Sequence, residues 1–462
     1  MYTGNHELVR NFRGPSRVAV LFIALYAAIT LALLPRLSLW LDEIIDLLGT
    51  QTHHVHEIVE YAASNPGGAP IWYLTQALTV GAMGFSAVSA RLPACMASIA
   101  SCVGMALLAR RAGGRWPTLC LALFALFPLQ LRYALEGRPY AEALCFSIWA
   151  TIIFLRLVER PGVITGLLYC LLVVLGLYTQ PYSIFVPAAQ VIWALTNPSV
   201  PLRARLLALG AVSVACAAFI PWFVYARQNW PSDLAPGVRR TLQPRILLLV
   251  LRECLGGGYP LSVPAILAVI AGLRSHSLRR SAKAMLLLTI LLPIGAALWV
   301  DYLFGYFVAI RQAIFILPAV ALLAASGVEY IAAKRGVLLA AALALLILTT
   351  SLVYDMHWLI RPREDWKTAT TVLQRSVDGG ACALLAPERT VQIFLFFDPG
   401  LLPRLYSEAS DFSQCSRIAV AVMPHDPLAS SAIAKQLADQ GFRRSQVIFA
   451  GDPAVRLFSR PE

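Results

Sequence analysis

The chain has 462 residues, of which 58% are hydrophobic and 14% are charged. Its mean hydropathy is +0.67. Soluble domains carry about 25% charged residues, so this composition excludes an ordinary soluble protein and indicates a membrane protein. The formal net charge is +13, but the basic residues sit in small clusters between apolar runs. That distribution argues against nucleic acid as a partner.

About eleven apolar stretches are predicted to be membrane helices. The first is too long for the hydrophobic region of a signal peptide, and no small-residue cleavage site follows it, so we expect it to be the first span. We therefore predict a polytopic α-helical membrane protein whose residues 1–354 form the transmembrane part. The predicted spans are 18–35, 91–109, 116–132, 140–157, 163–179, 182–196, 206–224, 259–273, 284–303, 312–331 and 336–354.

Arginine and lysine recur in clusters at every second turn between these spans. By the positive-inside rule, such turns and the amino terminus are cytoplasmic. An odd number of spans then places the segment after Tyr354 on the outer face of the plasma (inner) membrane. The clusters are Arg10, Arg13 and Arg17; Arg110, Arg111 and Arg115; Arg156 and Arg160; Arg203 and Arg205; Arg274, Arg279, Arg280 and Lys283; and Lys334 and Arg335.

Two predicted outer loops, 36–90 and 227–258, are longer than simple connectors. The first is acidic, and its stretches 38–50 and 53–63 alternate apolar and polar residues at helical spacing. This pattern predicts amphipathic helices on the membrane surface. Residues 69–85 are apolar but short, which leaves a re-entrant segment and a further surface helix as alternatives. The second loop is basic and ends in three glycines.

After Tyr354 the composition changes, and residues 355–462 are predicted to form a small α/β domain on the outer face. No glycine-rich phosphate loop or nucleophile motif opens its helices, so we assign it no catalytic chemistry. The nine cysteines of the chain show no metal-ligand spacing and are predicted to be small buried hydrophobic residues. The predicted elements are helices at 363–378, 388–397 and 428–440, strands at 381–386 and 417–423, and a closing hairpin of 446–450 with 455–459.

An acidic pair, Asp42 and Glu43, follows the first predicted span at the start of a short apolar helix. Ionisable residues beside the mouth of a span are costly and therefore are candidates for function. Adjacent residues of a helix point about 100° apart, so one carboxylate could act as a base while the other holds a partner. The simpler alternative is an acidic pair that favours the helix dipole or is solvated.

The predicted outer turn at 130–140 concentrates polar residues between two apolar spans. Arg132 and Glu136 have the spacing of an i,i+4 surface pair. Arg138 is a candidate for binding phosphate, because its planar guanidinium suits that group, and a phosphate beside a membrane cavity implies a lipid-linked substrate. Further candidates by the same logic are Arg132 itself, Tyr140 and, at a second outer span mouth, Tyr306 and Arg311.

A histidine run, His53, His54 and His56, lies in the acidic first loop. Such a run can bind a divalent metal, but it is more often a solvated polar face, and its spacing matches no strong zinc pattern. We therefore predict that no cofactor is required, with these three histidines as the alternative metal ligands.

The order of several short motifs resembles the GT-C class of integral membrane glycosyltransferases, in particular the protein O-mannosyltransferase and lipid A aminoarabinose transferase-like branch (glycosyltransferase family 39-like). The similarity extends over essentially the whole chain. In chain order the motifs are Asp42-Glu43, residues 65–74 (Asn-Pro-Gly-Gly-Ala-Pro-Ile-Trp-Tyr-Leu), Gly84 with Arg91-Leu92-Pro93, Glu136-Gly137-Arg138-Pro139-Tyr140, residues 313–318 and Arg363-Glu364-Asp365-Trp366.

This resemblance implies inverting transfer of a sugar from a polyprenyl-phosphate carrier to an acceptor at the outer face. An acceptor hydroxyl needs a base to take its proton as it attacks. Asp42 matches the base of the family, and Glu43 matches its neighbour. Arg138 matches the residue that stabilises the departing polyprenyl phosphate, with Arg311 as a second candidate.

Two departures from the family pattern bear on the substrate. Related sequences often read His-Pro-Pro-Leu-Tyr where this chain has residues 67–73, which removes a polar contact but keeps Tyr73 as a cavity candidate. The carboxy-terminal domain lacks the sugar-binding trefoil modules of eukaryotic protein mannosyltransferases, which favours a glycolipid or polysaccharide acceptor over a protein. The alternatives are a lipid-linked saccharide transporter or flippase, for which two related halves with broken spans are expected, and a non-catalytic membrane scaffold.

Overall fold

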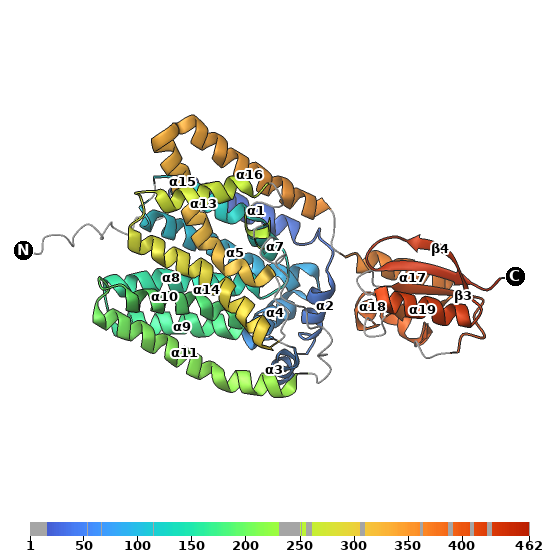
Figure 1. Cartoon of the computed structure of the whole chain (residues 1–462). Helices are drawn as coiled ribbons and strands as arrows, with labels where there is room; N and C mark the ends of the chain where they lie inside the picture. Colours follow the sequence, from blue (N-terminus) through green and yellow to red (C-terminus); the bar gives the residue numbers. More distant parts are fainter. Residues whose placement is uncertain are drawn as a thin grey trace, which may run out of the picture. The chain divides into compact units, whose positions relative to one another are not determined.

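The computed structural model describes residues 16–461 except 53, 66, 114, 231–249, 251, 256–260, 305–309, 361–363, 387–390, 407–410 and 423–426. The chain divides into two compact units (Figure 1). The first comprises Met1–Leu34 and Gly49–His357, and the second comprises Pro35–Leu48 and Trp358–Glu462. The loop predicted at 36–90 is thus divided between the two units, because its first part folds with the carboxy-terminal residues.

The first unit consists of helices throughout the residues that the structure describes (Figure 1). The described residues of all eleven stretches predicted as spans lie mainly in helices or broken helices. The helices are α1 (Arg17–Leu33), α3 (Val55–Ser64), α4 (Pro70–Met83), α5 (Ala87–Arg111), α6 (Pro117–Leu126), α7 (Pro128–Ala134), α8 (Tyr140–Glu159), α9 (Val163–Thr179), η1 (Pro181–Ile184), α10 (Phe185–Thr196), α11 (Leu202–Asn229), α13 (Val263–Arg274), α14 (Arg280–Phe304), η3 (Ile310–Ile316), α15 (Leu317–Arg335) and α16 (Val337–Ile360).

Six helices of the described chain are long and apolar enough to cross a membrane, and the bent pair α6–α7 makes a seventh if it is one span. Three more, α1, α9 and α13, are apolar but shorter. The prediction of a membrane protein with several apolar helices is confirmed. The exact number of eleven spans stays a prediction, as does the membrane-surface position of α3.

Helices α8, α9, α10 and α11 share one hydrophobic core in the first unit. At its centre the buried ring of Phe154 contacts Tyr169 and Trp193, with ring centroids 5.7 Å and 6.0 Å away. Small residues at the facing positions of α11, such as Ala204 and Ala208, let the helices approach.

Backbone-to-backbone packing joins α13 to α15. A Cβ atom added at Gly327 would lie 1.7 Å from the carbonyl oxygen of Ala268, and one added at Gly272 would lie 2.0 Å from that of Leu323. Both glycines are therefore needed for this approach, in the way that small residues are at membrane helix interfaces.

The second unit contains a five-stranded sheet with the order β2-β1-β3-β5-β4. β2, β1 and β3 are parallel, while β5 is antiparallel to both β3 and β4. The predicted helices, strands and closing hairpin are present, and β2 is an addition that its two residues were too few to signal. The elements are α2 (Leu41–Leu48), α17 (Trp366–Asp378), β1 (Cys382–Ala386), α18 (Val391–Phe397), η5 (Pro399–Arg404), β2 (Leu405–Tyr406), β3 (Arg417–Val422), α19 (Pro427–Asp439), β4 (Arg443–Phe449) and β5 (Ala454–Ser459).

A disulfide joins Cys382 of β1 to Cys415, which lies just before β3. The prediction that the cysteines are simple buried hydrophobic residues is wrong for these two. The bond joins residues 33 positions apart in the chain, and no short cysteine motif signals such a pairing. The free cysteines of the described chain all lie in the first unit.

We predict that Gly327→Ala lowers the free energy of unfolding by about 1–3 kcal/mol, because its new methyl group forces α13 and α15 apart. Gly295→Ala in α14 is the matched control, since no described heavy atom lies within 4 Å of its added Cβ. Thermal unfolding of both variants in detergent checks this. Equal midpoints for the two variants would contradict the close packing of α13 on α15.

Candidate active site

A break between α6 and α7 determines where Arg132 lies. Phe127 is extended (φ −65°, ψ 132°) and Pro128 opens α7. Because a proline pushes the preceding residue out of the helical region, the two helices meet at an angle of 65°. Arg132 falls in the last turn of α7, where a cation is favourable to the helix dipole, and its side chain is 20% exposed.

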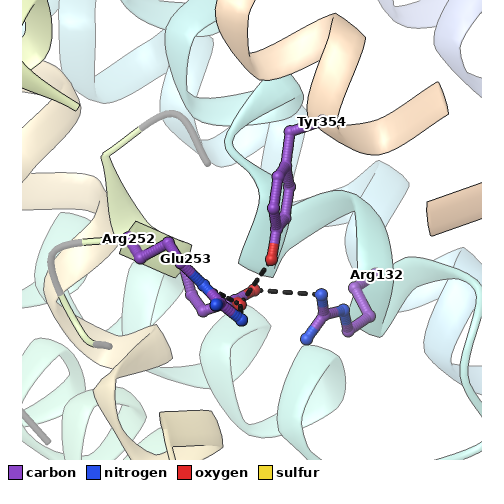
Figure 2. Close-up of polar contacts among 4 residues, drawn as sticks. All are labelled: Arg132, Arg252, Glu253 and Tyr354. Carbon is purple, nitrogen blue, oxygen red and sulfur yellow. Dashed lines mark hydrogen bonds and ion pairs between the residues drawn. The ribbon is translucent and has the colours of Figure 1, made fainter. Parts of the chain in front are cut away.

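Glu253 lies at the centre of a group of polar residues from three segments of the first unit (Figure 2). Its Oε2 lies 3.0 Å from Nη2 of Arg132. Its Oε1 accepts hydrogen bonds from Nη2 and Nε of Arg252, at 2.8 Å and 3.1 Å, and from the hydroxyl of Tyr354 in α16, at 2.6 Å. We call these four residues the Glu253 cluster.

The Glu253 cluster carries two guanidinium groups and one carboxylate, and the buried carboxyl groups of Glu136 and Asp355 also interact electrostatically with Arg132. The side chain of Glu253 is 1% exposed, and a carboxylate at such a site is tolerated only when cations and hydrogen bonds accompany it. Arg252 is 44% exposed and therefore can reach a second anion. Burial, together with the nearby Glu253 carboxylate, raises the pKa of the Cys254 thiol, which keeps this cysteine from acting as a nucleophile.

Two aromatic rings connect the neighbour of Arg132 to Arg311. Tyr133 of α7 packs against Tyr140, the first residue of α8, with 4.8 Å between ring centroids. The guanidinium carbon of Arg311 in η3 lies 5.7 Å from the centroid of the Tyr140 ring, within the range of a cation–π contact. The structure therefore brings together the outer turn at 130–140 and the second span mouth, which the sequence treats as separate clusters.

Arg138 lies in the turn between α7 and α8 and is half-buried. Its backbone N–H donates to the carbonyl of Glu136 at 2.8 Å, which tightens the turn. Arg138 is thus carried by the same corner of the first unit as Arg132 and Tyr140. The predicted candidate Tyr306 lies outside the described residues.

The acidic pair lies in the second unit, in the first turn of α2. Glu43 is 0% exposed, and its Oε2 accepts a hydrogen bond from the backbone N–H of Trp40 at 3.2 Å. This is the contact by which a glutamate in the first turn closes the start of a helix. Asp42 is half-buried instead, so the two carboxylates have different surroundings.

Tyr73 lies in the packing between α3 and α4. It is buried, its hydroxyl accepts a hydrogen bond from Nδ2 of Asn65 at 2.9 Å, and its ring meets that of Tyr61 edge-on. These contacts hold Tyr73 at the turn between the two helices, and its role as a cavity residue stays a prediction.

The described histidines of the run are on the surface. His56 is 81% exposed and its Nδ1 lies 3.6 Å from Oε2 of Glu60, while His54 precedes α3 and is exposed. His53 lies outside the described residues. Across the described parts of the chain, no three histidine, cysteine, aspartate or glutamate side chains are placed to hold a metal ion. The absence of a required cofactor stays a prediction.

Sequence reasoning missed the central carboxylate. Glu253 lies in the loop predicted at 227–258, and its only signal is a charged dipeptide, Arg252-Glu253, after an apolar run. Tyr354 was treated as the end of the last span. The i,i+4 spacing predicts a surface pair of Arg132 with Glu136. In the structure Glu136 is buried and interacts electrostatically with Arg132, and the ion pair of Arg132 with Glu253 is largely buried.

Comparisons with known proteins point to one class. A family model described as dolichyl-phosphate-mannose-protein mannosyltransferase matches residues 66–225. ArnT from Cupriavidus metallidurans in the apo state has a similar structure, with a TM-score of 0.58 at 13% identity, over 96% of this chain and 99% of that chain. The same protein bound to undecaprenyl phosphate gives 0.57 at 13% identity over the same shares.

The archaeal oligosaccharyltransferase AglB from Archaeoglobus fulgidus, in complex with an inhibitory peptide and a dolichol-phosphate, gives a TM-score of 0.53 at 10% identity over 92% of this chain and 72% of that chain. No curated protein matches the sequence. The resemblance predicted from the sequence is confirmed: the chain has the fold of the GT-C membrane glycosyltransferases.

We predict that Glu253→Ala lowers the free energy of unfolding by about 3 kcal/mol, since it leaves Arg132 and Arg252 without their shared carboxylate. Glu60→Ala is the matched control, because its pair with His56 is exposed and is worth about 0.2–1 kcal/mol. Chemical or thermal unfolding in detergent measures both. Equally small losses for the two variants would show that Glu253 does not hold the cluster together.

Proposed function

We propose that this chain is an inverting glycosyltransferase that takes its sugar from a polyprenyl-phosphate-linked donor. The observation that carries the proposal is that Arg132, Arg252 and Arg311 gather at one corner among the apolar helices of a GT-C fold. The titles of the similar structures support it, since ArnT is described with undecaprenyl phosphate and AglB with dolichol-phosphate. A phosphate on a lipid carrier is the anion that such a site is suited to accept.

In the proposed reaction the acceptor hydroxyl oxygen attacks the anomeric carbon of the donor sugar. Asp42 takes the hydroxyl proton as the new carbon–oxygen bond forms. The bond between the anomeric carbon and the phosphate oxygen breaks, and its electron pair leaves with the polyprenyl phosphate. Arg138 and Arg311 stabilise the charge that gathers on that phosphate, which is a gain made in the transition state.

The two acidic residues have different proposed roles. Glu43 is engaged with the Trp40 backbone amide, so we assign it to holding the start of α2 and leave proton transfer to Asp42. Arg132, already paired with Glu253, and Tyr140, in contact with Arg311, are proposed to shape the phosphate site. The acceptor is proposed to be a glycolipid or a polysaccharide, and no metal is required by these steps.

The Cys382–Cys415 disulfide bears on the orientation of the chain. Disulfides persist in oxidising compartments and are rare in a reducing cytosol. The bond therefore supports an extracytoplasmic position for the second unit, in agreement with the orientation proposed from the positive-inside rule. Chemistry on the outer face follows from this orientation, because Asp42 belongs to the same unit.

Thiol labelling of intact cells tests the orientation. Free thiols are blocked first with N-ethylmaleimide, then an impermeant phosphine reduces disulfides, and an impermeant maleimide polymer is added. We expect a mass shift of two labels that Cys382→Ser/Cys415→Ser abolishes. If the second unit were cytoplasmic, its thiols would already be blocked, and no shift would follow reduction.

We predict that Asp42→Asn lowers kcat by about 10²–10⁴-fold, the usual contribution of a general base, with little change in the unfolding midpoint. The assay follows release of polyprenyl phosphate from a polyprenyl-phosphate sugar by the purified protein in the presence of acceptor. Glu57→Gln, an exposed carboxylate in the first turn of α3, is the control and should leave kcat unchanged. Full turnover by Asp42→Asn would exclude Asp42 as the base.

A further inference from the structure

The tripeptide Glu364-Asp365-Trp366 opens α17, and the proposed function gives it no role. In the structure each of its three side chains makes a hydrogen bond within the second unit, and Glu364 and Trp366 bond to each other. Glu364 is 6% exposed, and its Oε2 accepts two hydrogen bonds. One comes from the backbone N–H of Leu41 at 2.6 Å, and the other comes from the indole Nε1–H of Trp366 at 2.5 Å.

Leu41 is the first residue of α2, and its N–H is one of the amides that have no partner inside a helix. Glu364 therefore caps α2 from a position 323 residues later in the chain. Glu43 accepts from the preceding amide, that of Trp40. The buried carboxylates of Glu43 and Glu364 thus accept hydrogen bonds from two consecutive backbone amides at the start of α2. The next residue in the chain is Asp42.

Trp366 keeps the Glu364 carboxylate in place. Its side chain is 0% exposed and meets the ring of Phe394 edge-on, with 5.4 Å between centroids. Asp365 caps α17 by accepting from the N–H of Thr368, and its own N–H donates to the carbonyl of Asp452 at 2.6 Å. The Glu364 carboxylate, which accepts the hydrogen bond from the start of α2, is therefore fixed by Trp366, whose side chain is buried in the second unit.

The hydrogen bond from Leu41 to Glu364 matters because α2 has only eight residues. Helices of this length are not stable on their own in water, so outside contacts must fix the position of α2. A carboxylate serves better than a neutral acceptor, because hydrogen bonds to a charged acceptor are about twice as strong and a negative charge favours the helix N-terminus.

We propose that Glu364 is the positioning residue for Asp42: it fixes the first turn of α2 through the Leu41 amide, and so sets the place of the base. The inference rests on the proposed function, in which Asp42 takes the proton of the acceptor. A misplacement of about 1 Å in a reacting group costs about 10²-fold in rate. Loss of the Glu364 contact therefore acts on kcat, whereas binding of the lipid-linked donor is left to other residues.

The test compares kcat, the KM for the polyprenyl-phosphate sugar and the unfolding midpoint among variants of the full-length protein. Glu364→Ala is expected to lower kcat about 10²-fold with the donor KM within about twofold of wild type. Glu364→Gln keeps an oxygen acceptor for both hydrogen bonds and is expected to recover most of kcat. Leu41→Pro removes the same amide from the other side, at the first helical position where proline is tolerated, and is expected to match Glu364→Ala.

Asp365→Ala is the matched control from the same tripeptide. It removes the cap of α17 and lowers the unfolding midpoint, but it is expected to leave kcat of the folded protein unchanged. If kcat of Glu364→Ala, calculated per folded protein molecule, equals that of wild type, the positioning role is excluded. If Glu364→Gln is as impaired as Glu364→Ala, the hydrogen-bond argument is wrong.

A double variant separates this inference from the proposed function. In the Asp42→Asn background, Glu364→Ala is expected to cause no further loss, since the residue it positions is already disabled. A wild-type rate for Asp42→Asn would overturn the base assignment and, with it, this inference. A disabled Asp42→Asn beside a fully active Glu364→Ala would overturn the positioning role alone.

Discussion

The burial of Glu253 among apolar helices is the constraint on which the first-unit site depends. Its side chain is 1% exposed, so the carboxylate requires the cations of Arg132 and Arg252 and the hydroxyl of Tyr354. These contacts tie α7 and the segment at 252–255 to α16. The contacts continue from α7 through Tyr133 to Tyr140 and Arg311, so that two clusters of arginine share one corner of the helical unit. Arg252 is 44% exposed and Arg138 is half-buried, so cations of this corner are accessible to an added anion.

The second unit also contains buried carboxylates, and these accept hydrogen bonds from backbone amides. Glu43 and Glu364 are both buried, and both accept hydrogen bonds from the backbone at the start of α2. The charge of each is thereby used to hold a short helix in place. Asp42, the other acidic residue of the first turn of α2, is half-buried.

Several motifs that carry the family resemblance have structural explanations. Arg91 is 1% exposed and donates from Nη1 to the carbonyl of Leu34 at the end of α1. Gly67 has a φ of +76°, and a Cβ at Gly68 would lie 2.2 Å from the carbonyl oxygen of Ala62, so the turn before α4 needs both glycines. Such motifs identify a fold because they hold its turns and helix ends, and they do not by themselves identify a substrate.

The helices and most of the strands were predictable, because long apolar runs and period-2 strands are local patterns. Pairings between distant residues were not. The membership of Pro35–Leu48 in the second unit, the Cys382–Cys415 disulfide and the partner of Arg132 all depend on contacts that no short window contains. Sequence marks Asp42, Arg138 and Arg311 as candidates and contains Glu364 in a family motif. It gives no role to Glu364 or Glu253, because those roles depend on hydrogen bonds and ion pairs to distant residues.

The central claim is that the chain transfers a sugar from a lipid phosphate, in contrast to carrying the intact lipid across the membrane. The most direct measurement places the purified protein in vesicles with a polyprenyl-phosphate sugar and follows the bond between sugar and phosphate. The account predicts that polyprenyl phosphate is released only when an acceptor is present, and that the anomeric configuration of the product is inverted. The account would be contradicted if the intact lipid-linked sugar moved between leaflets and no acceptor tested caused release of polyprenyl phosphate.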